Sequence, residues 1–256
     1  MIVFVTNLPS ATERRRHIAG QIAAADLDHE FVDCVIGNEL SDEEIAAKCD
    51  IDRIREFNQN VEWMNRGMIG CSLTSQNVHR SILERDLDFA MLLEDDTILP
   101  GNLKEILSEC EAVLQPGDVA LLFWLASGTA RLLGRSKIEL PSVDLYEVED
   151  PGSIHGGSAT IFTKEAARRI LSYNSPIRTT PDSWNEFIEA GCIDRLLLAY
   201  PMVVDTADFM STMELGRFVP LRRLINRYRL FPFYQILRKR RLRAKKSRQR
   251  AVVLDE

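Results

Sequence analysis

The sequence predicts an α/β fold with a mostly parallel central sheet. Short apolar runs, typical of buried strands, alternate along the chain with segments of helical pattern. Two Ser-x-x-Glu spacings, Ser10 with Glu13 and Ser41 with Glu44, predict helix starts between those runs. A further apolar run ends in a cluster of carboxylates at residues 94–96. Ligands of open α/β sheets bind at the carboxyl ends of strands, so this cluster is also the first functional candidate.

The strands and helices are expected in alternating order. Pro-Gly pairs at 100–101 and 116–117 mark the two ends of one helix. Thr163 is expected to cap the helix that follows it, and residues 126–152 to form a loop or sheet edge. The expected strands cover residues 2–5, 31–36, 89–94, 119–125, 158–162 and 202–204. The expected helices cover residues 11–25, 42–49, 70–85, 102–115, 164–173 and 182–190.

Composition limits the class of protein. A chain of 256 residues with 45% hydrophobic residues can bury the core of one large domain. No apolar stretch reaches about 18 residues, the length needed to span a membrane. The first residues lack the basic region of a secretory signal. The five cysteines contain no CxxC pair, which predicts free thiols in a reducing cytosol.

Charge divides the chain into two parts. Residues 217–256 hold 14 Lys+Arg and 2 Asp+Glu, a net charge of +12. Residues 1–216 hold the remaining 18 basic and 36 acidic residues, a net charge of −18. We therefore expect a catalytic domain at 1–216 and a basic C-terminal tail at 217–256. Such a tail is attracted to an anionic surface or to the acidic domain itself.

Three adjacent carboxylates, Glu94, Asp95 and Asp96, follow the apolar run. Because side chains alternate along a strand, Glu94 and Asp96 are expected to point the same way. Crowded carboxylates repel one another and are stabilised by a cation. Oxygen ligands suit Mg²⁺ or Mn²⁺, which keep coordination positions open for phosphate oxygens. The alternative interpretation is a strand that ends in an acidic, solvated turn.

Five segments carry a family resemblance. They are Phe4–Leu8 before the basic helix start Glu13–Arg16; Gly67, Gly70 and Cys71 before Ser72–Ser75; Leu93–Asp96; Gly157–Ala167; and Thr180–Asp182. In this order and spacing they resemble glycosyltransferase family 25, which includes galactosyl- and glucosyltransferases of bacterial lipopolysaccharide biosynthesis. The chain departs from the family pattern at Thr74–Ser75 and at Ala159–Thr160. The sugar and the acceptor therefore stay open.

The resemblance implies a GT-A-like fold and an inverting, metal-dependent hexosyltransferase. Galactose or glucose would move from a UDP-sugar to a hydroxyl of a lipopolysaccharide, lipooligosaccharide or related glycan. Mn²⁺ or Mg²⁺ would neutralise the leaving diphosphate. A carboxylate base on the opposite face of the sugar would activate the acceptor hydroxyl.

Each site residue has a predicted role and a structural alternative. Asp96 is the expected metal ligand, with His155 as a further ligand. Asp182 is the expected base, with Asp194 and Asp208 as competitors. The expected donor-binding residues are Asn7, Leu8, Arg14, Ser72, Gln76, Glu94 and Asp95. The structural alternatives are a turn for Asn7, a solvated helix face for Arg14, helix caps for Ser72 and Asp182, and a loop position for His155.

The tail mixes large apolar residues with arginines, as interfacial amphipathic segments do. It predicts an enzyme held peripherally on the cytoplasmic face of a bacterial inner membrane, where a lipid-linked acceptor is presented. In this interpretation the tail can be removed without loss of donor binding. The alternatives for the tail are a solvated segment, an oligomer contact, or packing on the acidic domain.

Two other function classes remain as alternatives. A nucleotidyltransferase also uses clustered carboxylates and a divalent ion, but the chain lacks the Gly-rich phosphate loop near its first strand. A non-catalytic nucleic-acid-binding module would use the basic tail, but the acidic domain and the absence of a recognisable module disfavour it. We therefore expect no nucleic-acid partner.

Overall fold

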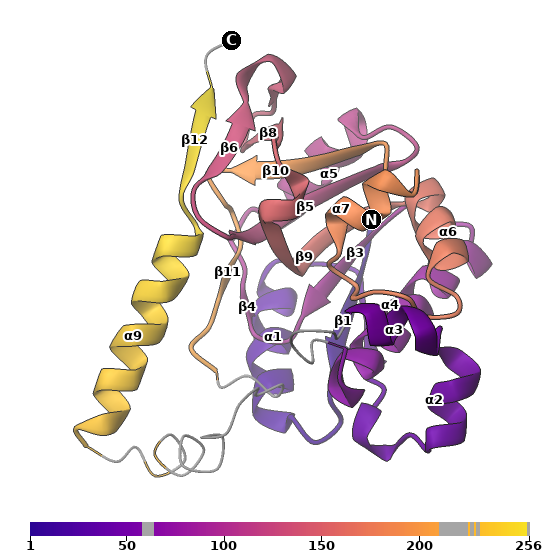
Figure 1. Cartoon of the computed structure of the whole chain (residues 1–256). Helices are drawn as coiled ribbons and strands as arrows, with labels where there is room; N and C mark the ends of the chain where they lie inside the picture. The colour runs from indigo at the N-terminus through magenta and orange to yellow at the C-terminus, as the bar shows by residue number, and fades with distance from the viewer. Residues whose placement is uncertain (58–63, 210–224, 226–227, 229–230, 255–256) are drawn as a thin grey trace.

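A mixed sheet forms the centre of the molecule (Figure 1). The computed structural model describes residues 1–57, 64–209, 225, 228 and 231–254. The sheet order is β2-β1-β3-β9-β5-β10-β8-β7. These strands are β1 (Ile2–Asn7), β2 (His29–Asp33), β3 (Phe89–Glu94), β5 (Asp118–Ala126), β7 (Ile138–Glu139), β8 (Asp144–Glu147), β9 (Ile154–Thr163) and β10 (Arg195–Tyr200).

The α/β class is confirmed, but the sheet is mixed rather than mostly parallel. The pairs β2–β1, β1–β3 and β5–β10 are parallel. The pairs β3–β9, β9–β5, β10–β8 and β8–β7 are antiparallel. β9 runs backwards between β3 and β5, which themselves point the same way. Apolar runs identify a buried strand but not its direction, so the sequence could not reveal this insertion.

Helices cover both faces of the sheet because successive strand side chains point to opposite faces. Val3 and Val5 of β1 pack with α1 (Thr12–Ala24) and α5 (Leu103–Val113). Ile2 and Phe4 of β1 pack with α4 (Arg66–Glu84), α6 (Lys164–Tyr173) and α7 (Trp184–Glu189) on the other face. We call these the α1 face and the α4 face.

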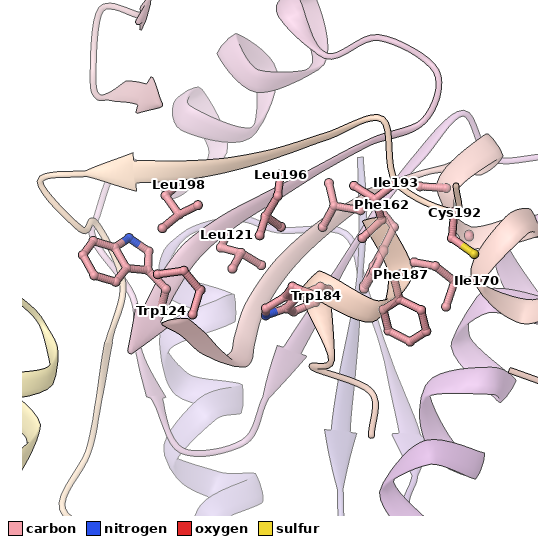
Figure 2. Close-up of a cluster of buried hydrophobic side chains, with 14 of the residues drawn as sticks. Leu121, Trp124, Phe162, Ile170, Trp184, Phe187, Cys192, Ile193, Leu196 and Leu198 are labelled. Atoms are coloured by element: carbon pink, nitrogen blue, oxygen red, sulfur yellow. The ribbon is translucent and has the colours of Figure 1, made fainter. Parts of the chain in front are cut away.

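The α4 face carries the larger aromatic core. Figure 2 shows Trp184 and Phe187 of α7 beside Phe162 of β9, with Leu121 and Leu196 in the same cluster. The Trp124 indole is fully buried and donates to the Ala199 carbonyl oxygen at 3.0 Å. Core packing is therefore the role of Trp124. Trp184 is also buried, and its indole nitrogen donates to the Gly156 carbonyl oxygen at 3.1 Å, which joins α7 to β9.

Some of the predicted helix starts are confirmed and others are wrong. α2 (Asp42–Lys48) has the predicted capping box of Ser41 and Glu44, and Thr163 caps α6 through the Ala166 amide. The capping box predicted at Ser10 is wrong, because α1 begins after Ala11 and has no side-chain cap. α4 begins at Arg66, earlier than predicted, because the Asn65 side chain accepts from the Met68 amide.

Strand β10 was not predicted, although its apolar run lies just before the expected last strand at 202–204. That last strand is replaced by β11 (Asp205–Thr206), which pairs with β4 (Thr97–Ile98) beside the carboxylates. Within the predicted edge region, β6 (Ala130–Leu133) pairs with β12 (Ala251–Leu254). Within the described residues the other helices are α3 (Ile51–Phe57), α9 (Phe233–Arg248) and the short 3₁₀ helices η1 (Gly37–Glu39), η2 (Gly134–Ser136) and η3 (Pro151–Ser153).

The C-terminal tail is folded where the structure describes it. α9 and β12 lie along one side of the molecule, with α9 beside β11 (Figure 1). The predicted domain boundary at 216/217 lies outside the described residues. No helix in the described parts of the chain is long and apolar enough to cross a lipid bilayer. The five cysteines all lie within the described residues and none of them forms a disulfide, which agrees with the prediction of thiols.

Candidate active site

Strands β1 and β3 are parallel neighbours, so their carboxyl ends bring Asn7 and the predicted carboxylates together. The Asn7 side-chain amide donates to Asp95 Oδ2 at 2.6 Å. Arg14 of α1 forms an ion pair with Asp95 Oδ1 at 2.7 Å and a second with Asp96 Oδ2. We call these four residues, Asn7, Arg14, Asp95 and Asp96, the carboxylate–arginine cluster. A guanidinium therefore supplies the cation that the adjacent carboxylates require.

Two polar atoms of this cluster are buried without a hydrogen-bond partner among the residues that the structure describes. They are Asp96 Oδ1 and Arg14 Nε. Burial raises the pKa of Asp96, while the nearby Arg14 charge opposes that rise. An unsatisfied buried carboxylate oxygen is costly in a folded protein and marks a position where a ligand or ion can bind.

Glu94 faces the other way. β3 ends at Glu94, so the alternation of side chains along the strand does not extend to Asp96. Glu94 contacts Ser158, whereas Asp96 contacts Arg14, so the two side chains do not point the same way as predicted. Glu94 Oε2 accepts from the Ser158 hydroxyl at 2.8 Å, on the α4 face. The Glu94 side chain is open to solvent, yet the surrounding protein and the Asp96 charge raise its pKa to about 7.

A cavity of about 150 Å³ opens on the α4 face beside Glu94. Its wall comes from β1, β3, β9, α4 and the loop before α7, together with Cys34 just after β2. The lining residues are Thr6, Cys34, Met68, Cys71, Thr74, Ser75, Leu92, Glu94, Gly156, Gly157, Thr160, Phe162, Pro181, Asp182 and Trp184. Two carboxylates, Glu94 and Asp182, therefore share one cavity although they lie 88 positions apart in the sequence.

Asp182 is held in place by its own loop and by β9. Its Oδ2 accepts from the Gly156 amide at 2.9 Å, and its Oδ1 accepts from the Thr180 hydroxyl at 2.8 Å. Gly156 has a φ of +81°, a conformation that suits glycine and turns its amide toward Asp182. Asp182 does not cap α7, whose N-cap is Ser183. Each carboxylate oxygen keeps a lone pair for a substrate proton.

The other base candidates lie elsewhere. Asp194 precedes β10 and pairs with Arg169 at 2.8 Å, at the edge of the sheet opposite to Glu94. Asp208 lies beside β11 and pairs with Arg238 and Arg241 of α9. Neither lines the cavity, so the geometry favours Asp182.

Several predicted donor-binding residues have structural partners instead. Ser72 and Gln76 lie inside α4 rather than at its start, and both are buried. Their side chains donate to the Thr179 and Asn174 carbonyl oxygens at 3.3 Å and 2.5 Å. Ser72 and Gln76 therefore do not face a ligand from a helix N-terminus, contrary to the prediction. The Leu8 carbonyl oxygen accepts from the Ala11 amide at 2.8 Å, in the turn that leads into α1.

The sequence analysis missed several cavity residues, most clearly Cys34 and Thr6. Cys34 follows β2 and lies at the same sheet edge as Asn7, so the strand-end argument could have found it. Burial raises the pKa of the Cys34 and Cys71 thiols to about 12, which keeps both protonated. They line the cavity as weakly polar groups rather than as nucleophiles.

The residues fit a divalent ion in part. Among the described residues no group of three His, Cys, Asp or Glu side chains is placed to hold a metal. Mg²⁺ is often bound by one or two carboxylates, with water and substrate phosphates completing its coordination. Asp96 Oδ1, which has no partner among the described residues, is an oxygen of this kind, and its metal role stays a prediction. His155 Nε2 instead shares a hydrogen bond with the Ser127 hydroxyl at 2.5 Å. Its metal role stays a prediction.

Sequence comparison identifies the family. The profile of glycosyltransferase family 25, described as an LPS biosynthesis protein family, matches residues 1–145. The chain belongs to glycosyltransferase family 25. The matched region includes the carboxylate–arginine cluster and Glu94 but ends before Asp182.

Individual relatives are more distant. Procollagen galactosyltransferase 1-A of Xenopus laevis is 27% identical over 152 residues, which are 59% of this chain and 23% of the relative. A putative glycosyltransferase of Haemophilus influenzae is 30% identical over 104 residues, 41% of this chain and 35% of the relative. The chain thus spans about a quarter to a third of the length of these relatives.

Two solved structures overlap the chain weakly. One is a glycosyltransferase involved in the glycosylation of the major capsid of PBCV-1, with a TM-score of 0.40 and 12% identity over 82% of this chain and 93% of that one. The other is a 4-diphosphocytidyl-2C-methyl-D-erythritol synthase, with a TM-score of 0.40 and 14% identity over 88% of this chain and 97% of that one. Overlaps of this size do not bear on the reaction.

Proposed function

We propose that this protein is an inverting glycosyltransferase that moves a hexose from a UDP-sugar to a hydroxyl of a lipopolysaccharide or related glycan. One observation carries the proposal. Glu94 joins the carboxylate–arginine cluster to a cavity that also contains Asp182. The site thus has a charged part suited to a diphosphate and a recess suited to a sugar. The reaction requires these two parts side by side.

The charged part would bind the nucleoside diphosphate. Arg14 already spans Asp95 and Asp96, and the unpartnered Asp96 Oδ1 would hold Mn²⁺ or Mg²⁺. When bound, the ion would neutralise charge on the leaving diphosphate. Arg14, turned from its carboxylates, would add two hydrogen bonds to phosphate oxygens. Asn7 holds Asp95 in place through its 2.6 Å hydrogen bond.

The cavity would hold the transferred sugar and the reacting acceptor hydroxyl. Asp182 would take the proton of that hydroxyl as general base, and the Gly156 and Thr180 hydrogen bonds fix its orientation. Glu94 would accept from a sugar hydroxyl while Ser158 holds its other side. The largely apolar wall excludes water, which limits hydrolysis of the donor.

A donor array tests the proposed reaction. Purified protein is mixed with UDP-galactose, UDP-glucose and other nucleotide sugars, Mn²⁺ and a panel of glycan acceptors, and products are read by mass spectrometry. We expect hexose transfer from a UDP-sugar, and its loss in EDTA. Release of pyrophosphate from a nucleoside triphosphate and a sugar phosphate would instead indicate a nucleotidyltransferase. Full transfer in EDTA would overturn the metal dependence.

The outward side of α9 supports a membrane role for the tail. Phe231 and Phe233 are 77% and 60% exposed, next to a helix with eight Lys+Arg and no acidic residue. Anionic lipids complement this surface, at about 1 kcal/mol per basic residue near the bilayer. We expect sedimentation with anionic liposomes that weakens steeply with salt. Absence of binding to anionic vesicles at low salt would remove the inner-membrane location from the proposal.

A further inference from the structure

The inner side of α9 is bound to the body of the protein. The partly buried residues of the helix include Tyr234, Leu237, Arg241 and Lys245. Their spacing of three or four residues places them on one side of the helix. Two of the four are basic, so the tail turns part of its positive charge toward the acidic domain rather than toward solvent.

These basic side chains hold one short segment, residues 205–209. Asp208 pairs with Arg238 at 2.8 Å and with Arg241 at 3.1 Å. Lys245 pairs with Asp205, and its Nζ donates to the Thr206 carbonyl oxygen at 2.7 Å. The same Nζ lies 6.0 Å from the centre of the Phe123 ring. Lys245 is therefore the best-enclosed basic residue of the helix, with a 21% exposed side chain.

The segment 205–209 in turn contacts the carboxylate–arginine cluster. The Ala207 amide donates to the Asp96 carbonyl oxygen at 2.7 Å, and β11 pairs with β4 just after Asp96. The Phe209 ring centre lies 5.5 Å from the Arg14 guanidinium carbon. Thus segment 205–209 connects the tail helix with Asp96 and Arg14 of the cluster.

We infer that α9 is part of the donor site, in which Lys245, Arg238 and Arg241 are positioning residues that hold segment 205–209 against Asp96 and Arg14. The inference rests on the proposed function, since the ligand whose binding depends on this segment is the nucleoside diphosphate. It replaces the expectation that the tail is only an anchor, removable without loss of donor binding.

The attachment of the tail allows this role to be tested locally. Beyond α9, β12 pairs with β6, and the Ala130 amide donates to the Arg250 carbonyl oxygen at 2.8 Å. A single change at Lys245 therefore leaves the helix anchored. Lys246, its neighbour in sequence, is exposed and forms no ion pair within the described residues. It provides a control of equal charge on the same helix.

The experiment compares full-length wild type with Lys245→Met, Lys245→Arg and Lys246→Met. UDP is titrated calorimetrically in the presence of Mn²⁺, and kcat and the KM for donor and acceptor are measured separately. We expect Lys245→Met to weaken UDP binding and raise the donor KM about tenfold, the effect of losing one charged hydrogen bond. The acceptor KM should not move. Lys245→Arg should restore most of the binding, and Lys246→Met should stay within about twofold of wild type.

A second pair of variants covers the case in which Lys245→Met fails to fold. The double variant Arg238→Gln/Arg241→Gln removes both ion pairs of Asp208. The double variant Lys239→Gln/Arg240→Gln removes the same charge from exposed positions and is the control. We expect weaker UDP binding only in the first pair. Equal UDP binding within each matched set would overturn the inference and leave the proposed function standing. If wild type binds no UDP, the proposed function fails and the inference fails with it.

Discussion

Two aspartate–arginine clusters lie at opposite edges of the same sheet. Their hydrogen bonding differs, and the difference distinguishes a cluster that stabilises the fold from one that can bind a ligand. At the amino ends of β5 and β10, both carboxylate oxygens of buried Asp118 accept hydrogen bonds from the Arg195 guanidinium. The distance from Arg195 Nε to Asp118 Oδ1 is 2.9 Å, and the Gln115 amide also donates to Asp118 Oδ2 at 2.7 Å. At the carboxyl ends of β1 and β3, Arg14 binds Asp95 and Asp96 but leaves Asp96 Oδ1 and its own Nε unpartnered.

The second difference between the clusters is space. Asp95 and Asp96 directly follow Glu94, which lines the cavity together with Asp182, whereas Asp118 and Arg195 do not line that cavity. A carboxylate whose hydrogen bonds are complete stabilises the fold. One with an oxygen that has no partner among the described residues, as Asp96 Oδ1 has none, can bind a ligand or an ion at that oxygen.

The largest expected effect is at Asp96. Asp96→Asn should keep the fold and lower transfer at least about a thousandfold, because a neutral amide would hold less tightly the divalent ion that would neutralise charge at the diphosphate. The measurement is steady-state transfer, with circular dichroism to check folding. Near-wild-type turnover would mean that the open oxygen has no catalytic use.

The next effect is at Asp182. Asp182→Asn should lower kcat by about two to four orders of magnitude, the usual range for loss of a general base, with little change in UDP affinity. Asp194→Asn is the matched control. Asp208→Asn should weaken UDP binding, because Asp208 pairs with Arg238 and Arg241. An inactive Asp194 variant, or an Asp208 variant that loses kcat but keeps its UDP affinity, beside an active Asp182 variant would move the base to that residue.

His79 is a buried group without hydrogen bonds to the described residues, and it does not line the cavity. It should therefore affect the stability of the fold rather than catalysis. Neither ring nitrogen has a hydrogen-bond partner in the described part of the chain, and the ring packs edge-on against Phe162 with centroids 4.8 Å apart. Burial, with a smaller contribution from Arg80, lowers the pKa of His79 to about 4 from 6.5. The unfolded chain therefore binds the proton more readily, so stability is complete above pH 6.5 and falls as the pH drops to 4.

The predicted loss attributable to His79 is about 3 kcal/mol over that pH range. Urea unfolding at pH 7 and pH 4.5 measures it in wild type and in His79→Leu. The difference between the two pH values should shrink in the variant. An unchanged difference would show that His79 does not control acid stability.

The smallest expected effect is at the completed cluster. Asp118→Asn should lower the free energy of unfolding by about 2 kcal/mol through the loss of its charged hydrogen bonds to Arg195. Transfer per folded molecule should be unchanged. A loss of turnover without loss of stability would contradict the distinction between the two clusters.

The sequence predicted the edge of the sheet where the site lies but not its full wall. The apolar run before Glu94 and the strand that ends at Asn7 were sufficient to predict this edge, because ligands of an α/β sheet bind at the carboxyl ends of its strands. The pairing of Glu94 with Asp182 was not predictable, since it depends on β9 running backwards between β3 and β5. Direction within a sheet comes from long-range contacts rather than from local pattern.

The tail shows the same limit. Its charge predicted attraction to an anionic surface or to the acidic domain, and both alternatives were open in the sequence. The contacts of Arg238, Arg241 and Lys245 with residues 205–208 favour the domain for one side of α9. Local periodicity could not decide this, because the partner residues belong to a segment with no strong strand or helix signal.

The most direct test is calorimetric titration of UDP, with Mn²⁺, into wild type, Asp96→Asn and Asp118→Asn at a temperature where all three are folded. The central claim is that the carboxylate–arginine cluster binds the nucleoside diphosphate and that the completed cluster does not. It predicts binding by wild type and Asp118→Asn, with loss in Asp96→Asn. Equal UDP affinity in Asp96→Asn and wild type would contradict the claim.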